Sequence, residues 1–189
     1  MVIRYSASRA PEVLAQILEL QRLNLRDNLS PAEATEQGFL MIRHEPSNLG
    51  EICGAHGHVV ALEGSRVVGY ALVMLKEFAD SIPLLVSMFE QLDRIPYGSA
   101  VVGDLNYFVL GQVCVAKEVR GTGVFGGLYD ELRARMSGAF PLVVTEVATR
   151  NARSLRAHAK VGFRSLHRYV APEGEEWDVI AWDWLPCKK

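Results

Sequence analysis

The glycine-rich segment at residues 119–132, VRGTGVFGGLYDEL, contains residue types that can bind a phosphate group. Gly121, Gly123 and Gly126 form the G-x-G-x-x-G pattern of dinucleotide sites, whereas the same loop read from Arg120 has the pattern R-x-x-G-x-x and fits a different phosphate ligand. A strand that leads through such a turn into a helix exposes unpaired backbone N–H groups at the positive end of the helix dipole. The segment therefore predicts a phosphate-binding loop with two candidate ligands.

The dinucleotide interpretation is supported by one residue and opposed by the surroundings of the loop. Glu146 lies about 20 residues beyond Gly126, where an acidic side chain would hold the ribose hydroxyls. However, the polar segment AKEVR separates the apolar strand from Gly121, although the first glycine should follow the strand almost at once. Only about 70 residues follow the start of the loop, too few to complete a doubly wound sheet. A dinucleotide-dependent oxidoreductase is therefore kept as a minor alternative.

A second motif lies downstream of the loop. Residues 151–163, NARSLRAHAKVGF, have the form N-x-x-S-x-x-x-H-x-K-x-G-F. Together with VCVAKEVRGTGVFGGLYDEL, this segment resembles the GCN5-related N-acetyltransferase (GNAT) family over residues 107–165. The resemblance implies one domain over residues 1–189 with an α+β fold, in which helices flank both faces of a mixed central β-sheet of about seven strands. It also implies an enzyme that moves an acetyl group from acetyl-CoA directly to a primary amine of a small molecule or peptide.

The resemblance assigns acetyl-CoA to the glycine loop and to the strand before it. In the family, backbone N–H groups of the loop wrap the coenzyme A pyrophosphate, while the strand edge and the asparagine of the second motif contact the pantetheine arm. The corresponding residues here are Val113, Val115, Arg120, Gly121, Thr122, Gly123, Val124, Phe125, Gly126 and Asn151. The family usually has Gly or Ala at the position of Phe125, so this ring either points away from the phosphates or shifts the turn by one residue.

Two further residues are candidates for proton transfer, because the attacking amine must lose a proton to a base and the departing thiolate must gain one. Glu146 stands five residues before Asn151, where the ribosomal-protein N-acetyltransferase branch of the family places a base. His158 occupies the position of the tyrosine that protonates the thiolate in most of the family, so we expect His158 or solvent to supply that proton. The departures at His158 and Phe125 keep open a non-catalytic acyl-CoA-binding or sensor domain as the main alternative.

Other reactive side chains have simpler explanations. Cys114 lies in an apolar strand without a histidine partner in view, which is typical of a core residue and not of an acyl-cysteine nucleophile. His56 and His58 lack a third ligand, so no metal site is expected. The acidic turn APEGEEWD at residues 171–178 would suit a cationic amine, but a solvated hairpin turn explains the same residues.

Hydrophobic periodicity and turn signals predict the elements that position these residues. Strands are expected at residues 2–6, 107–116 and 140–148 and in hairpins at 58–75 and 163–185, with helices at 10–25, 30–42, 81–95, 123–136 and 151–161. Ser30 and Glu33 form a capping box, and Asn151 caps the last helix. The resemblance implies that strands 107–116 and 140–148 splay apart to leave the cofactor cleft. It also implies that segment 77–106 covers the acceptor mouth.

Composition disfavours several other classes of function. The 189 residues are 49% apolar and 22% charged, as expected for one globular domain, and the formal charge of −2 disfavours nucleic-acid binding. The three cysteines are widely spaced, the N-terminus lacks the features of a signal peptide, and the longest apolar run (67–75) is too short to span a membrane. We therefore expect a soluble, cytoplasmic protein with no membrane or nucleic-acid partner, and a homodimer is left open.

Overall fold

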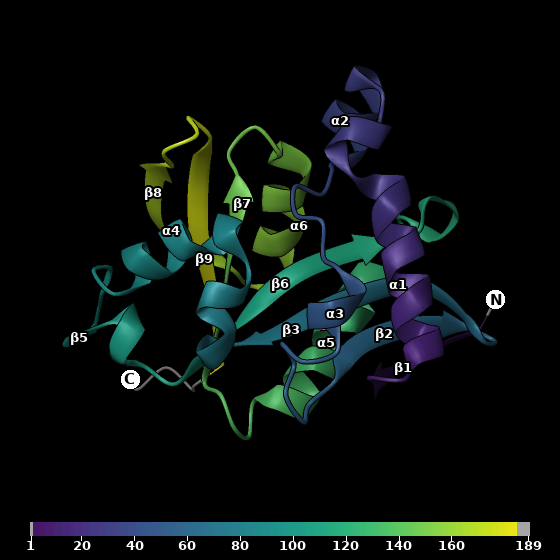
Figure 1. Ribbon diagram of the computed structural model, residues 1–189, viewed down its shortest axis with the longest axis horizontal. Coiled ribbons are helices and arrows are strands. Elements are labelled where there is room, and N and C mark those ends of the chain that lie inside the picture. The colour runs from purple at the N-terminus through teal and green to yellow at the C-terminus, as the bar shows by residue number, and fades with distance from the viewer. Residues whose placement is uncertain (1, 185–189) are drawn as a thin grey trace.

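A seven-stranded mixed β-sheet forms the centre of the molecule (Figure 1). The computed structural model describes residues 2–184, apart from the side chains of residues 80, 81, 83 and 84. The strand order is β1-β2-β3-β6-β7-β9-β8, and all neighbours are antiparallel except β6 and β7. These strands are β1 (Ile3–Ser8), β2 (His58–Glu63), β3 (Arg66–Leu75), β6 (Tyr107–Val115), β7 (Leu142–Ala148), β8 (Arg164–Val170) and β9 (Glu176–Asp183), and β4 (Pro96–Tyr97) and β5 (Ala100–Val101) form a separate ribbon.

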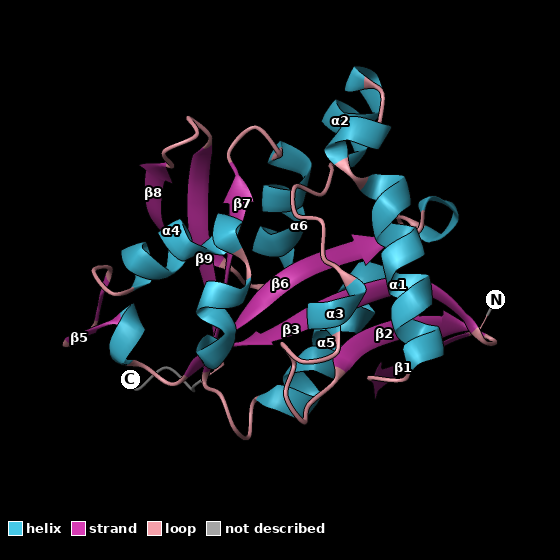
Figure 2. Ribbon diagram, viewed as in Figure 1, coloured by secondary structure: helices cyan, strands magenta, loops and turns pink. Residues whose placement is uncertain are grey.

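Helices cover both faces of the sheet (Figure 2). They are α1 (Pro11–Asn24), α2 (Pro31–Gln37), α3 (Pro46–Leu49), α4 (Pro83–Leu92), α5 (Val124–Met136) and α6 (Ala152–Val161). Figure 1 shows α1 and α3 in front of strands β2 and β3, and α5 behind them. Strand β3 is buried on both sides by this arrangement, which explains its nearly continuous apolar sequence. The predicted α+β fold with about seven strands is confirmed.

The two parallel strands at the middle of the sheet diverge. Residues Tyr107–Val109 of β6 pair with Leu142–Val144 of β7, and no later pair follows between these two strands. Gly111 forms a bulge in β6, because its neighbours Leu110 and Gln112 pair with the consecutive residues Val73 and Leu72 of β3. The predicted splaying of these strands is therefore confirmed, and it creates the gap in which the candidate site lies.

Most predicted elements are observed within a few residues of their expected ends, but the helix expected at residues 30–42 is wrong in its second half. The Ser30 cap is present, with its Oγ accepting a hydrogen bond from the Glu33 N–H at 3.2 Å. Helix α2 then ends at Gln37, because Gly38 adopts a left-handed φ of +77°. Residues 39–45 continue without helical structure. This segment lies beside the candidate site.

Among the helices that the structure describes, none is long and apolar enough to cross a membrane. Within residues 2–184, no group of three or more His, Cys, Asp or Glu side chains could hold a metal ion. Cys53 and Cys114 are buried free thiols, and Cys187 lies outside the described residues.

Candidate functional site

A cleft of about 540 Å³ opens where β6 and β7 diverge. It lies between the second half of β6, the glycine loop, α6 and the segment after α2. The predicted cofactor residues that line it are Val113, Val115, Arg120, Gly121, Gly123, Phe125, Gly126 and Asn151. The side chains of Thr122 and Val124 point elsewhere, since Thr122 Oγ1 donates to the Val119 carbonyl at 2.7 Å and Val124 is buried in the core. The structure thus brings most of the predicted residues to one cleft.

The backbone of the glycine loop leaves room for a ligand. Gly121 and Gly123 have φ angles of +79° and +92°, which residues with a side chain rarely adopt. A Cβ atom at Gly121, Gly123 or Gly126 would meet no other atom within 4 Å. Helix α5 begins at Val124 without a side-chain cap, so the N–H groups of its first turn can donate to an anion.

The Phe125 ring lies along the wall of the cleft. Its centroid is 4.9 Å from that of Tyr129, one helical turn further on, and 5.5 Å from that of His158 on α6. The ring therefore packs between the two helices, and Gly121 and Gly123 keep their open positions in the turn. A phenylalanine at this position was expected either to point away from the phosphates or to shift the turn by one residue. The geometry favours the first alternative, because the side chain points away from the loop.

Four basic side chains line the cleft, and only the first of them, Arg120, was predicted from the sequence. Arg120 is held by hydrogen bonds from Nε to the Val115 carbonyl (3.1 Å) and from Nη2 to Asn24 Oδ1 (2.5 Å). Arg153, Arg156 and Lys160 project from α6 at helical spacing. Their spacing within the second motif was the signal that could have found them. The cleft therefore combines backbone N–H donors with cations, as a phosphate-rich ligand requires.

A smaller inner chamber of about 90 Å³ adjoins the cleft. The residues common to both are Phe39, Leu40, Val113, Asn151 and Ser154. Leu85 and Met88 of α4 form part of its wall, which agrees with the prediction that segment 77–106 covers this region. Glu146 of β7 lies in the chamber, as its alternation along the strand predicts.

Glu146 is a largely buried carboxyl with one direct partner. Its Oε2 accepts a hydrogen bond from the Tyr169 hydroxyl at 2.6 Å, and its Oε1 has no partner among the described residues. Burial raises the pKa of Glu146 to about 8, the Tyr169 hydrogen bond opposes this shift, and the nearby charge of Glu173 adds to it. The carboxyl thus changes its charge close to neutral pH, as a general base should. Tyr169 was not identified from the sequence.

His158 of α6 is buried against Phe125 and Tyr129 of α5 and lines the chamber. Its Nδ1 lies 2.8 Å from the Ser154 carbonyl oxygen, and its Nε2 has no partner among the described residues. Burial lowers the pKa of His158 to about 4, so the ring is neutral at pH 7. Ser154 Oγ also lies 3.2 Å from Nδ1, but the shorter contact is to a carbonyl, which only accepts, so we assign the single proton of the neutral ring to Nδ1. In this arrangement Nε2 has no proton to give.

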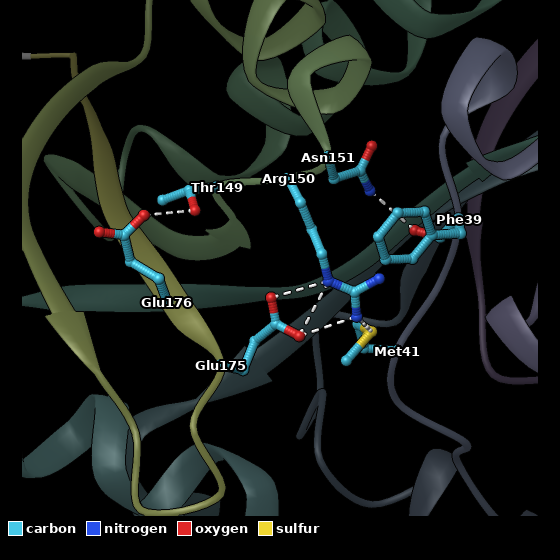
Figure 3. A network of polar contacts seen from close by, with 7 residues as sticks. All are labelled: Phe39, Met41, Thr149, Arg150, Asn151, Glu175 and Glu176. Carbon is cyan, nitrogen blue, oxygen red and sulfur yellow. Dashed lines mark hydrogen bonds and ion pairs between the residues drawn. The ribbon is translucent and has the colours of Figure 1, made fainter.

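Segment 39–42 forms one wall of both cavities and is held in place from outside by Arg150 (Figure 3). The Arg150 guanidinium lies 4.8 Å from the centroid of the Phe39 ring, and its Nη2 is 3.5 Å from Met41 Sδ. The same group binds both carboxylate oxygens of Glu175 at 2.7–3.0 Å. Asn151 Nδ2 donates to the Phe39 carbonyl at 3.0 Å. The segment is thereby tied to the β7–α6 and β8–β9 turns.

A buried polar network holds the other side of this segment. Gln112 of β6 donates to the Ile42 carbonyl at 2.8 Å and accepts hydrogen bonds from Tyr70 (2.6 Å) and Gln21 (3.2 Å). Gln21 in turn accepts the His44 N–H at 3.1 Å. Because these groups are satisfied mainly by one another, they specify the position of the segment against the strand.

Asn151 is a buried residue that caps α6 and lines both cavities. Its Oδ1 accepts the Ser154 N–H at 3.3 Å, which confirms the predicted cap of α6. At the other end of the helix, Gly162 has a φ of +117°, and a Cβ there would lie 2.6 Å from Trp182 Nε1. These two residues place α6 against the sheet, so that Ser154 and His158 reach the inner chamber.

Most carboxylates of the acidic turn at residues 171–178 are paired within the fold. Glu175 binds Arg150, and Glu176 accepts a hydrogen bond from Thr149 at 2.6 Å (Figure 3). Asp178 is buried and accepts hydrogen bonds from Ser165 (2.5 Å) and Arg168 (3.1 Å). The observed pairing therefore supplies a structural reason for these acids and weakens the argument that they attract a cationic amine.

Cys114 and His58 have surroundings typical of core residues. Burial raises the pKa of the Cys114 thiol to about 12, so it is not a thiolate at neutral pH. His58 is fully buried, with Nε2 2.6 Å from the Leu49 carbonyl and Nδ1 accepting the Val73 N–H at 3.2 Å. Both side chains therefore serve packing and backbone hydrogen bonding.

Comparison with known proteins identifies the fold. No protein-family model and no curated protein sequence matches the chain. Among solved structures, NAA60 from Arabidopsis thaliana in complex with acetyl-CoA has a TM-score of 0.64 at 16% identity, over 96% of this chain and 99% of that one. The ribosomal-protein-S18-alanine N-acetyltransferase from Escherichia coli has a TM-score of 0.61 at 13% identity, over 100% and 97%. Ard1 from Thermoplasma volcanium has a TM-score of 0.64 at 14% identity, over 98% and 100%.

Proposed function

We propose that the chain, which shares its fold with solved acetyltransferases of the GNAT family, is an acetyl-CoA-dependent N-acetyltransferase that acts directly on a primary amine of a small molecule or peptide. The observation that carries this proposal is the junction between the cleft and the inner chamber. Val113, Asn151 and Ser154 line both cavities, and Glu146 lies in the inner one. A cofactor in the cleft would thus present its reactive end to a chamber that contains a titratable carboxyl.

The cleft suits a long ligand with phosphates at one end. In this proposal, the N–H groups around residues 120–126 donate to the diphosphate, and the basic side chains of α6 lie beside it. The backbone of β6 at Val113 and Val115, which has lost its pairing with β7, bonds the pantetheine arm. NAA60, which has the same fold, is known in complex with acetyl-CoA, and that supports the choice of ligand.

The chemistry uses Glu146 as the general base. The carboxylate takes a proton from the amine, the amine nitrogen forms a bond to the acetyl carbon, and the carbon–sulfur bond breaks. A backbone N–H of β6 near Val113–Val115 stabilises the oxyanion. The thiolate then takes a proton, and the geometry of His158 favours solvent as the donor, because its neutral ring holds its proton on Nδ1.

The proposal predicts that the purified protein acetylates at least one amine. Acetyl-CoA should be incubated with a panel of primary amines and short peptides, with free thiol and acetylated product measured in parallel. We expect stoichiometric product and thiol. Acetyl-CoA binding without turnover on any amine would favour the sensor domain, whereas tight NAD(H) binding without coenzyme A binding would favour the dinucleotide oxidoreductase.

A further inference from the structure

If the proposed function is correct, the inner chamber limits which substituent the acceptor can have on the carbon next to its amine. Apolar side chains of Met41, Leu85, Met88, Val109 and Trp177 form part of its wall, beside the uncharged polar groups of Gln112, Thr145, Asn151 and Ser154. These five apolar residues belong to four separate parts of the chain, so apolar surface faces the chamber from several elements. A substituent beside the amine can therefore contact hydrocarbon and the indole ring, and none of the neighbouring polar side chains named here carries a charge.

The chamber also lacks a pairing partner for a charged group on the substituent, among the residues that the structure describes. Among its described lining residues, only Glu146 and His158 are ionisable, and the proposed mechanism uses Glu146 for the amine itself. His158 is neutral at pH 7, because burial lowers its pKa to about 4. The nearby cation Arg150 is bound at two points by Glu175. A carboxylate or ammonium on the substituent would therefore lose its hydration without gaining a partner, which is costly.

The volume sets the size of the substituent. The chamber measures about 90 Å³, whereas an apolar cavity that is known to bind benzene measures about 150 Å³. Segment 39–42, which forms one wall, is held by Arg150 on one side and Gln112 on the other, so this wall resists expansion. The available space fits a few carbon atoms and excludes an aromatic ring.

We propose that the acceptor is a primary amine whose neighbouring substituent is a small, uncharged, apolar group of the size of an isopropyl side chain. A peptide with such a first residue and a small amine with the same group share this chemistry. The inference rests on the proposed acetyltransferase activity and adds a substrate class to it. Met88, which is fully buried at the chamber wall, would then help to set the size limit.

The test compares three α-amino amides of related shape with the wild-type protein. Valinamide is small and apolar, the α-amide of aspartate is similar in size but charged, and phenylalaninamide is apolar but too large. We expect kcat/KM for valinamide to exceed the other two by at least about tenfold, within the range that differences of one or a few groups produce in an apolar pocket. Peptides that begin with Val, Asp or Phe should rank in the same order.

A pair of variants tests the wall itself. Met88→Ala should raise kcat/KM for phenylalaninamide relative to valinamide by about fivefold or more, as an added volume of a few methylene groups allows. Met74→Ala is the matched control, because Met74 is equally buried but does not line the chamber. The wild-type ranking decides the inference even if either variant is too unstable to measure.

The outcomes separate the inference from the proposed function. Acetylation of the aspartate amide or phenylalaninamide at least as fast as valinamide would overturn the inference and leave the acetyltransferase activity standing. Acetylation of none of the amides or peptides by a protein that binds acetyl-CoA would contradict the proposed function, and the inference would fall with it.

Discussion

Replacement of Glu146 by glutamine is expected to lower kcat for amine acetylation by about 10²–10⁴-fold, the usual contribution of a general base. Glutamine keeps the size of the side chain and can still accept the Tyr169 hydrogen bond, but it cannot take a proton. Because Glu146 lies in the inner chamber and does not line the cofactor cleft, the Kd of acetyl-CoA should stay within about twofold of the wild-type value. Steady-state kinetics and calorimetric titration measure the two quantities.

Glu173→Gln is a suitable control for this experiment. It makes the same chemical change near Glu146, whose pKa the Glu173 charge raises, but Glu173 does not line the chamber. We expect less than about a threefold change in kcat. The rise of kcat with pH should occur at slightly lower pH, because the charge that raises the pKa of Glu146 is removed. If Glu146→Gln turns over as fast as the wild type, Glu146 is not the base. If the variant loses acetyl-CoA binding, Glu146 contributes to the cofactor cleft, which would contradict its assignment to the inner chamber.

The second large effect concerns Tyr169, which controls the pH range in which Glu146 is ionised. The hydroxyl donates to Oε2 at 2.6 Å and stabilises the carboxylate, which lowers the pKa of Glu146 against the effect of burial. A hydrogen bond to a charged group contributes about 1.5–3 kcal/mol, and one pKa unit corresponds to about 1.36 kcal/mol. Tyr169→Phe should therefore raise the pKa of Glu146 by about one to two units.

The direction of the shift in the pH–rate profile follows from the role of Glu146, because only its carboxylate form can accept a proton from the amine. The wild-type rate should rise with pH as Glu146 ionises near its pKa of about 8. In Tyr169→Phe the same rise should occur about one to two pH units higher, so that the rate at pH 7 falls by about 10- to 100-fold and is largely recovered in alkaline solution. The pH dependence of kcat with one amine, compared between the two proteins, measures the shift.

A second tyrosine–carboxylate pair provides the control. Tyr97 donates to Asp183 Oδ2 at 2.7 Å, and neither residue lines the inner chamber. Tyr97→Phe makes the same atomic change and should leave the pH profile in place. If Tyr169→Phe loses activity equally at all pH values, Tyr169 supports the fold of the chamber and does not tune the base.

The parts of the fold that local sequence signals determine could be predicted. Ser30, Asn151 and Gly162 mark helix ends through hydrogen bonds or backbone angles that involve only nearby residues, and the apolar run of β3 shows that it is buried on both sides. The glycine loop is similarly local. Its conformation depends on the positive φ angles of Gly121 and Gly123, which are available to glycine wherever the rest of the chain lies.

The features that were missed depend on contacts between distant residues. The path of segment 39–42 is determined by Gln112 and Arg150, which lie about 70 and 110 residues further along the chain. Tyr169 reaches Glu146 only because β9 lies between β7 and β8 with a defined register. Periodicity within a single strand contains no information on such pairings.

The position of His158 could be predicted from the sequence, but its protonation state could not. The motif placed it correctly on the inner side of α6, but its protonation depends on rings from Phe125, Tyr129 and Phe163, which exclude water from the imidazole. The sequence spacing therefore located the side chain and did not indicate its pKa.

The most direct test of the central claim is a crystal structure of the protein with bound acetyl-CoA. We expect the diphosphate oxygens at hydrogen-bonding distance, about 2.7–3.2 Å, from backbone nitrogens of residues 121–126. The thioester should lie at Val113, where the cleft meets the chamber that holds Glu146. Acetyl-CoA bound outside the cleft, or a thioester directed away from the chamber, would contradict the account.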